Sequence, residues 1–392
     1  MSSKSVHSDR TFSGALLVIS ILIASAGGAL FWYYTPRESD LSHARDAPRE
    51  FSSKPTTSPS DFEATYNQLG IQPLPSTIEG QQRISSRLAQ LKREPCYTDA
   101  IIGLGRALLD AGYPREAATS LRSFVRRCGR TAEVLPLAFT ALDRINDFSG
   151  ALEVADELVE AVPANGSFRY WRALAYDRAG KFSQAMVDYM NTIQLAADSK
   201  RVPGDVFYKW AQSYAALGRY CDAISPIEMY ISLDPAKRRT PQTTKIISDY
   251  AERGDCDKRY ATGTARVPFA VGLSVRRLSV VVNNVAGTLI LDTGATFVSI
   301  TSRFALKAGV ATDSDNQVFM KTVGGKSLAD IGYANSISVG KAAAFGVATA
   351  VMRDDGDPFG NGVDGLLGMS FLSRFNVRLS PTEVEMTATP LR

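Results

Sequence analysis

The chain has 392 residues, a length typical of two or three domains. Hydrophobic residues make up 45% and charged residues 21%, and the net charge is +4, so neither global disorder nor nucleic-acid binding is expected. Histidine occurs only as His7 and His43, which argues against a Ser-His-Asp triad, a Cys-His dyad and a histidine-rich zinc site.

The first predicted element is an apolar segment, residues 12–34, which contains no charged side chain. As a helix it would be about 35 Å long, enough to cross a hydrocarbon core of ~30 Å. Because Lys4 and Arg10 precede it, the positive-inside rule makes residues 1–11 a cytoplasmic tail and places the rest of the chain outside. A signal peptide cleaved after Ala26 remains an alternative. We expect a single-pass inner-membrane protein with a periplasmic main part.

Residues 35–60 are rich in Ser, Pro and charge, which predicts a flexible linker, and residues 61–260 have a helical pattern. Within that region alanines recur at separations of 34, 34 and 38 residues, where small side chains let paired helices approach. This period resembles the tetratricopeptide repeat family. The resemblance implies a solenoid of helix pairs whose groove binds a protein partner. The recurring alanines are Ala117, Ala151, Ala185 and Ala223.

The chain has four cysteines, none of them in a C-x-x-C pair, so a metal or thioredoxin-type motif is not expected. Within the repeat frame, antiparallel helices bring the first two cysteines together and the last two together. The sequence therefore predicts the disulfides Cys96–Cys128 and Cys221–Cys256, while four free buried thiols remain the alternative.

Residues 261–392 change to an alternating pattern, which predicts an all-β domain. A very apolar strand, residues 289–291, leads directly into an acidic side chain, and burying a carboxylate there requires a reason. Roughly 70 residues later a second apolar strand follows, and we expect it to pack beside the acidic turn. The two motifs consist of Asp292, Thr293, Gly294 and Ala295, and of Leu366, Leu367 and Gly368.

Together these motifs resemble the retropepsin-like aspartic proteases, the retroviral-type single-domain enzymes, and in particular the exported bacterial ones. The resemblance implies a homodimer, because the chain has one Asp-Thr-Gly motif and each protomer would contribute Asp292. It also implies that two Asp292 carboxylates activate a water for peptide-bond hydrolysis, with no metal and no cofactor. The hairpin that contains Val323, Gly324 and Gly325 corresponds to the family's flap, which closes over a protein or peptide substrate.

The sequence thus predicts a multi-domain protein with a transmembrane helix, an all-α repeat solenoid and an all-β retropepsin-like domain. The predicted function is a membrane-anchored aspartic endopeptidase whose repeats recruit substrate or a partner. The alternative is a non-catalytic module that uses the same fold for peptide binding or dimerisation. The substrate, the control of dimerisation and the role of Asp364, which either caps its turn or lines the cleft, stay open.

Overall fold

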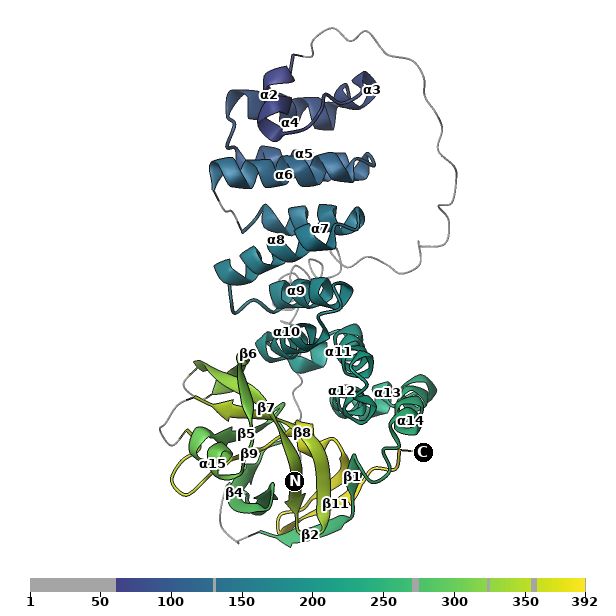
Figure 1. Ribbon diagram of the computed structural model, residues 1–392, viewed down its shortest axis with the longest axis vertical. Helices are drawn as coiled ribbons and strands as arrows, with labels where there is room; N and C mark the ends of the chain where they lie inside the picture. Colours follow the sequence, from purple (N-terminus) through teal and green to yellow (C-terminus); the bar gives the residue numbers. More distant parts are fainter. Residues whose placement is uncertain (1–60, 130–131, 270–274, 323–324, 354–357, 392) are drawn as a thin grey trace, which may run out of the picture. The chain divides into compact units, whose positions relative to one another are not determined.

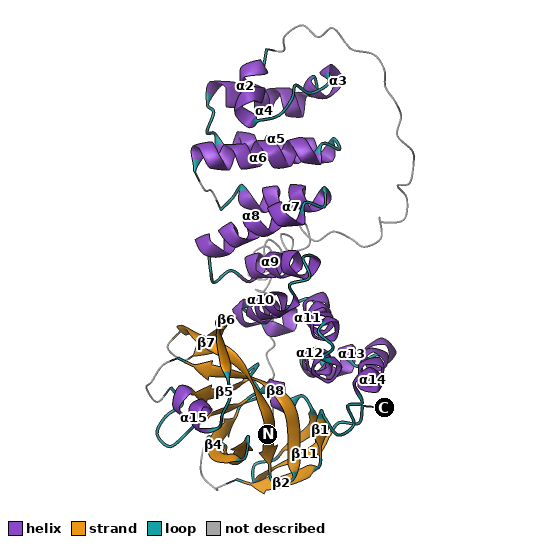
Figure 2. Cartoon of the chain, viewed as in Figure 1, coloured by secondary structure: helices purple, strands orange, loops and turns teal. Residues whose placement is uncertain are grey.

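The computed structural model describes residues 61–129, 132–269, 275–322, 325–353 and 358–391 (Figures 1 and 2). The predicted tail, apolar segment and linker, residues 1–60, lie outside these ranges. Among the described residues, no helix combines the length and the apolar character needed to cross a membrane. That finding contradicts the prediction of a single-pass inner-membrane protein, and we assign no membrane location.

The helical region begins with three helices and continues with helix pairs in chain order (Figure 1). The first three are α2 (Glu63–Leu69), α3 (Ser76–Glu79) and α4 (Gln82–Arg93). The pairs are α5 (Thr98–Asp110) with α6 (Pro114–Cys128), α7 (Leu135–Arg144) with α8 (Phe148–Ala161), α9 (Gly166–Arg178) with α10 (Phe182–Leu195), and α11 (Gly204–Ala216) with α12 (Tyr220–Ser232). The remaining helical elements are η2 (Ser199–Arg201), α13 (Pro235–Arg238) and α14 (Pro241–Gly254).

Small side chains allow the paired helices to pack closely. The four recurring alanines lie in the second helix of each pair and are all buried. At Gly105 an added Cβ would lie 2.9 Å from Leu137 of the next pair and 3.1 Å from Leu121 of its own partner helix. The wider separation of 38 residues before the last alanine corresponds to η2, which is inserted between α10 and α11.

Each first helix of a pair ends in the same backbone conformation. The second residue past its end has a positive φ, a left-handed conformation that costs glycine little and that asparagine tolerates. This turn sends the chain back along the helix it has just left. The four residues are Gly112 (φ 83°), Asn146 (φ 56°), Gly180 (φ 70°) and Gly218 (φ 73°).

Two disulfides join helices of the helical region. Cys96 precedes α5 and is bonded to Cys128 at the end of α6, while Cys221 in α12 is bonded to Cys256 just after α14. These are the pairs expected from the order of the helices.

Replacing Cys221 and Cys256 together by serine is expected to lower the free energy of unfolding by about 2–4 kcal/mol. The bond closes a loop with a sequence separation of 35 residues, and its loss lets the unfolded chain sample many more conformations. Urea denaturation followed by circular dichroism would measure the change. The wild type under reducing conditions, which also loses Cys96–Cys128, should be less stable than the double variant. An unchanged midpoint of the double variant would contradict the prediction.

The β region forms an eight-stranded sheet with the strand order β1-β8-β5-β9-β4-β3-β7-β6, and β7 also pairs with β8. A three-stranded sheet has the order β10-β11-β2. The first strands are β1 (Ala261–Thr262), β2 (Thr264–Pro268), β3 (Arg277–Val282), β4 (Val285–Leu291) and β5 (Val298–Thr301). Next come α15 (Ser302–Lys307), β6 (Thr312–Thr322), β7 (Gly325–Val339), β8 (Ala342–Met352) and β9 (Gly365–Leu367). The last elements are α16 (Met369–Leu372), β10 (Phe375–Leu379) and β11 (Glu383–Ala388).

One hydrophobic core lies within the β region, and a second joins the repeats to the sheet. From the sheet, the joint core contains buried side chains of β6, β7 and β8, and from the repeats it contains buried side chains of α10, α11 and α12. The repeats and the sheet therefore share part of their interior. The large members include Met190, Ile193, Trp210, Ile224, Val318, Met320, Ile331 and Met352.

Candidate active site

Strand β9 lies between β4 and β5, parallel to β4 and antiparallel to β5. The loop 292–297, which connects β4 to β5, therefore passes over the end of β9. Ile290 pairs with Leu366 and Leu291 pairs with Leu367. The topology thus brings the two predicted motifs together at one end of the sheet.

The carboxylate of Asp292 is held by the turn that follows it. Its Oδ1 accepts hydrogen bonds from the backbone N–H of Gly294 at 2.8 Å and of Ala295 at 3.2 Å. The backbone N–H of Asp292 donates to the carbonyl of Leu367 at 3.2 Å, which ties the turn to β9. Asp292 is half-buried, while Thr293 and Gly294 are exposed. We call this exposed turn, residues 292–294, the rim. One chain thus presents one fixed carboxylate on its rim.

Two glycines flank the apolar pair of β9 because the neighbouring backbone passes directly over them. An added Cβ would lie 2.0 Å from the carbonyl oxygen of Ser299 at Gly365 and 2.2 Å from that of Phe297 at Gly368. Immediately after Gly368, the N–H of Met369 donates to the carbonyl of Ala295 at 2.8 Å. These contacts fix the loop that carries Asp292 onto β9.

Gly368→Ala is expected to lower the free energy of unfolding by about 1–3 kcal/mol, because overpacking forces backbone atoms apart. The colliding atoms are main-chain atoms of Phe297 and Ala295, which cannot rotate away as a side chain can. Thermal and urea unfolding would measure the loss. Gly166→Ala in α9 is the matched control, since an added Cβ there lies 3.3 Å from its nearest neighbour, the carbonyl of Thr192. Equal stability of the two variants would contradict this reading.

Asp364, whose role the sequence leaves open, holds strands together. Its carboxylate accepts a hydrogen bond from the backbone N–H of Thr288 in β4 at 2.9 Å. Its backbone carbonyl accepts from Thr301 at the end of β5 at 3.0 Å. The contacts support a capping role for Asp364. Among the described residues, no group of three or more His, Cys, Asp or Glu side chains is placed to hold a metal ion.

Sequence reasoning missed Ser370, a buried serine behind the loop. Its Oγ accepts a hydrogen bond from the N–H of Val298 at 2.8 Å and donates to the carbonyl of Ala348 at 2.7 Å. It thereby joins the end of the loop to β8. The available signal was a hydroxyl directly after an apolar run, since a buried polar group needs partners.

The predicted flap is a hairpin of β6 and β7. Lys321 pairs with Lys326, and Thr322 pairs with Gly325. Val323 and Gly324 lie outside the described residues, while Gly325 begins β7 with a φ of 120°. That conformation is readily available only to glycine.

The repeats pack directly against the loop that carries Asp292. The indole of Trp210 in α11 meets the ring of Phe297 edge-on, with centroids 6.1 Å apart, and both residues are buried. Beside them the hydroxyl oxygens of Tyr214 in α11 and Tyr333 in β7 lie 3.2 Å apart. Burial raises the pKa of both hydroxyls, so they stay neutral in the joint core. These contacts were not predicted.

The β region thus has an Asp-Thr-Gly turn bonded to a Gly-Leu-Leu-Gly strand and, later in the chain, the hairpin of β6 and β7. A family model described as an aspartyl protease matches residues 278–371, and one described as a tetratricopeptide repeat matches residues 137–203. The C-terminal region is thus a retropepsin-like aspartyl protease domain that follows a tetratricopeptide-repeat region. No curated protein matches the chain.

Several solved structures are similar to parts of the chain. A crystal structure of MamA is 19% identical, covers 46% of this chain and 98% of that one, and has a TM-score of 0.36. A retropepsin-like aspartic protease from Rickettsia conorii is 26% identical, covers 33% of this chain and 96% of that one, and has a TM-score of 0.25. YrrB, a TPR protein with an unusual peptide-binding site, is 16% identical, covers 45% of this chain and 94% of that one, and has a TM-score of 0.36. With TM-scores this low, the class rests on the family models.

Proposed function

We propose that the protein is an aspartic endopeptidase whose site is completed by a second copy of the chain. The observation that carries the proposal is the setting of Asp292, a carboxylate fixed by two backbone N–H groups on a rim where Thr293 and Gly294 are exposed. A water-activating pair needs two such carboxylates, and the chain has one Asp-Thr-Gly motif. An isologous dimer, with the two rims facing each other, would supply the second one.

In the proposed dimer the two Asp292 carboxyl groups share one proton, because two adjacent carboxylates cannot both ionise. The ionised group removes a proton from a water as the water oxygen bonds to the scissile carbonyl carbon. The protonated group gives its proton to the carbonyl oxygen, and a gem-diol forms. When the C–N bond breaks, the amine leaves with a proton and the carboxyl pair is restored. No covalent enzyme intermediate is needed.

The role we propose for the repeats is recruitment of a protein substrate or partner. A hollow between α6 and α8 is lined by charges of both signs, which suits a polar polypeptide segment more than an apolar ligand. In it Arg122 already bonds Glu153 at 2.8 Å, so a ligand would compete with that pair. The charged lining residues are Arg115, Arg122, Arg126, Asp147 and Glu153.

The test is an endopeptidase assay of the purified full chain on an unfolded protein, such as reduced casein, from mildly acidic to neutral pH. Cleavage by the wild type, and none by Asp292→Asn, is the expected result. Cleavage by neither would favour the binding-module alternative, whereas equal cleavage by both would trace the activity to a contaminant or to another site.

A further inference from the structure

Residues 292–297 form the loop that carries the proposed catalytic aspartate, and α16 holds the main chain of this loop. The backbone N–H of Met369 donates to the carbonyl of Ala295 at 2.8 Å, and that of Ser370 donates to the carbonyl of Thr296 at 2.9 Å. These bonds attach the loop to the sheet by its backbone, but they do not place its one large side chain.

That side chain, Phe297, is held by the repeats. It is 0% exposed and belongs to the joint core, whereas its neighbour Val298 belongs to the core within the β region. The indole of Trp210 in α11 lies against it, with ring centroids 6.1 Å apart and an angle of 67° between the ring planes. Edge-on packing at such a separation is favourable for aromatic rings. The loop thus ends where the repeats and the sheet share their interior.

Packing, rather than a hydrogen bond, orients Trp210. The residue is 1% exposed, and its Nε1–H finds no acceptor among the residues that the structure describes. The ring of Tyr214 in the same helix lies 6.1 Å from the indole. The Arg219 guanidinium in turn lies 4.9 Å from the Tyr214 ring and 4.2 Å from the ring of Tyr333 in β7. A continuous series of packed side chains thus joins β7 to the indole that contacts Phe297.

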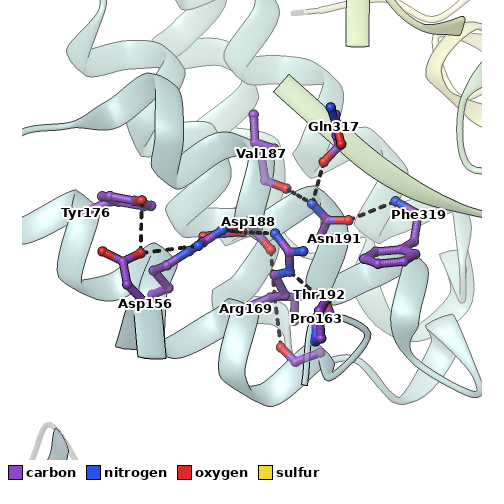
Figure 3. A network of polar contacts seen from close by, with 12 residues as sticks. Asp156, Pro163, Arg169, Tyr176, Val187, Asp188, Asn191, Thr192, Gln317 and Phe319 are labelled. Carbon is purple, nitrogen blue, oxygen red and sulfur yellow. Dashed lines mark hydrogen bonds and ion pairs between the residues drawn. The ribbon is translucent and has the colours of Figure 1, made fainter. Parts of the chain in front are cut away.

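The repeat helices around Trp210 are themselves fixed to the sheet. In α10 the side-chain amide of Asn191 donates to the carbonyl of Gln317 at 2.8 Å and accepts from the N–H of Phe319 at 2.9 Å, both in the edge strand β6 (Figure 3). Asn191 is 0% exposed, and its Nδ2 also donates to the carbonyl of Val187 in the same helix at 3.0 Å. Because α10 packs against α11, these bonds give Trp210 a fixed base from which it contacts the loop.

We propose that Trp210, in the repeats, is a positioning residue for Asp292. The proposal rests on the proposed endopeptidase function. Without the indole, Phe297 can move into the space that the indole leaves, and the loop moves with it. The carboxylate in the same loop then loses its alignment with the water and with the second carboxylate of the proposed dimer. A misplacement of about 1 Å can slow a reaction about 100-fold, whereas substrate binding draws on the whole cleft.

The test compares Trp210→Leu with Phe207→Leu in the full chain, by steady-state cleavage of fluorescein-labelled reduced casein. Phe207 is the matched control because it lies in the same helix, is 0% exposed and packs its ring against Tyr230 of α12, with centroids 5.5 Å apart. We expect Trp210→Leu to lower kcat about tenfold with KM changed less than about twofold. Phe207→Leu should leave both constants within about twofold of wild type. Equal losses of kcat would overturn the proposal, since both variants remove a buried aromatic ring from α11.

A double-mutant cycle asks whether Trp210 acts through Phe297. Phe297→Leu alone should lower kcat about tenfold, because it removes the other half of the contact. The double variant should lose little more than either single variant, since residues that act as one unit have non-additive effects. Losses that multiply, to about 100-fold, would overturn action through this contact.

Hydrogen exchange gives a readout that needs no activity. The N–H groups of Met369 and Ser370 are bonded to loop carbonyls that Trp210→Leu leaves chemically unchanged, so their exchange reports how often the loop separates from α16. We expect this exchange to become about tenfold faster. The N–H of Ala388, which donates to the carbonyl of Gly263 at 3.0 Å outside the loop, should exchange as in the wild type. Unchanged exchange at Met369 and Ser370 would overturn the proposal.

The exchange measurement also separates this proposal from the proposed function. A wild-type chain that cleaves nothing would overturn the endopeptidase function, and exchange alone would then decide whether Trp210 holds the loop. Should Trp210→Leu fail to fold, Trp210→Phe replaces it, because phenylalanine keeps an aromatic ring but a smaller one. That variant should lower kcat about two- to threefold and speed the same exchange less strongly. Wild-type values of both would overturn the proposal.

Discussion

Asp292→Asn is expected to reduce peptide-bond hydrolysis by about 10³-fold or more, since the amide can neither take a proton from water nor return one. Asparagine has the same size and keeps an oxygen that can accept from Gly294 and Ala295, so the turn should survive. Cleavage of unfolded casein, measured beside melting temperature, would separate lost chemistry from lost fold. Asp364→Asn is the matched control in the same domain and should retain activity within a few-fold. Equal losses in both variants would argue that fold, and not proton transfer, had been damaged.

Mixing the two proteins tests whether the site needs two chains. In randomly assorted dimers from equal amounts of wild type and Asp292→Asn, only about a quarter of the pairs carry two carboxylates. Total activity should therefore fall to about a quarter of that of an all-wild-type sample at the same total concentration. Activity that simply halves would point to a site built within one chain.

The second large effect is expected on removing the repeats. A fragment of residues 261–392 should fail to fold as a compact monomer, because it would expose the sheet side of the joint core. Each of the large side chains uncovered would lose about 1.5–3 kcal/mol of burial, a large amount against the usual stability of a domain. The side chains concerned include Val318, Met320, Ile331 and Met352.

Circular dichroism, dye binding to exposed apolar surface and gel filtration of the fragment would measure this outcome. A longer fragment, residues 162–392, is the matched control, since it restores α9 to α14 and with them the repeat side of the core. It should fold where the shorter one does not. A stable, monomeric shorter fragment would show that the joint core contributes little.

The sequence predicts well what depends on local pattern. The helix pairs follow from the alanine period, because it places one small side chain in the second helix of each pair. The contact between the turn at Asp292 and the Leu366–Leu367 strand could be predicted, because each motif includes an apolar strand and their spacing resembles that of the family. The contacts of Asn191 with β6 and of Trp210 with Phe297 could not be predicted. Each joins residues far apart in sequence and depends on how the repeats and the sheet pack together.

Modular proteins usually exchange their parts through linkers that few contacts cross. The switch from helical to alternating pattern near residue 260 resembles such a junction, yet the joint core extends across it. A repeat array from another protein could not replace α10 and α11 unless it also matched the surface of β6 and the position of Phe297. The last two repeats and the sheet should thus diverge together, substitution by substitution, while the earlier repeats, α5 to α8, are freer to change.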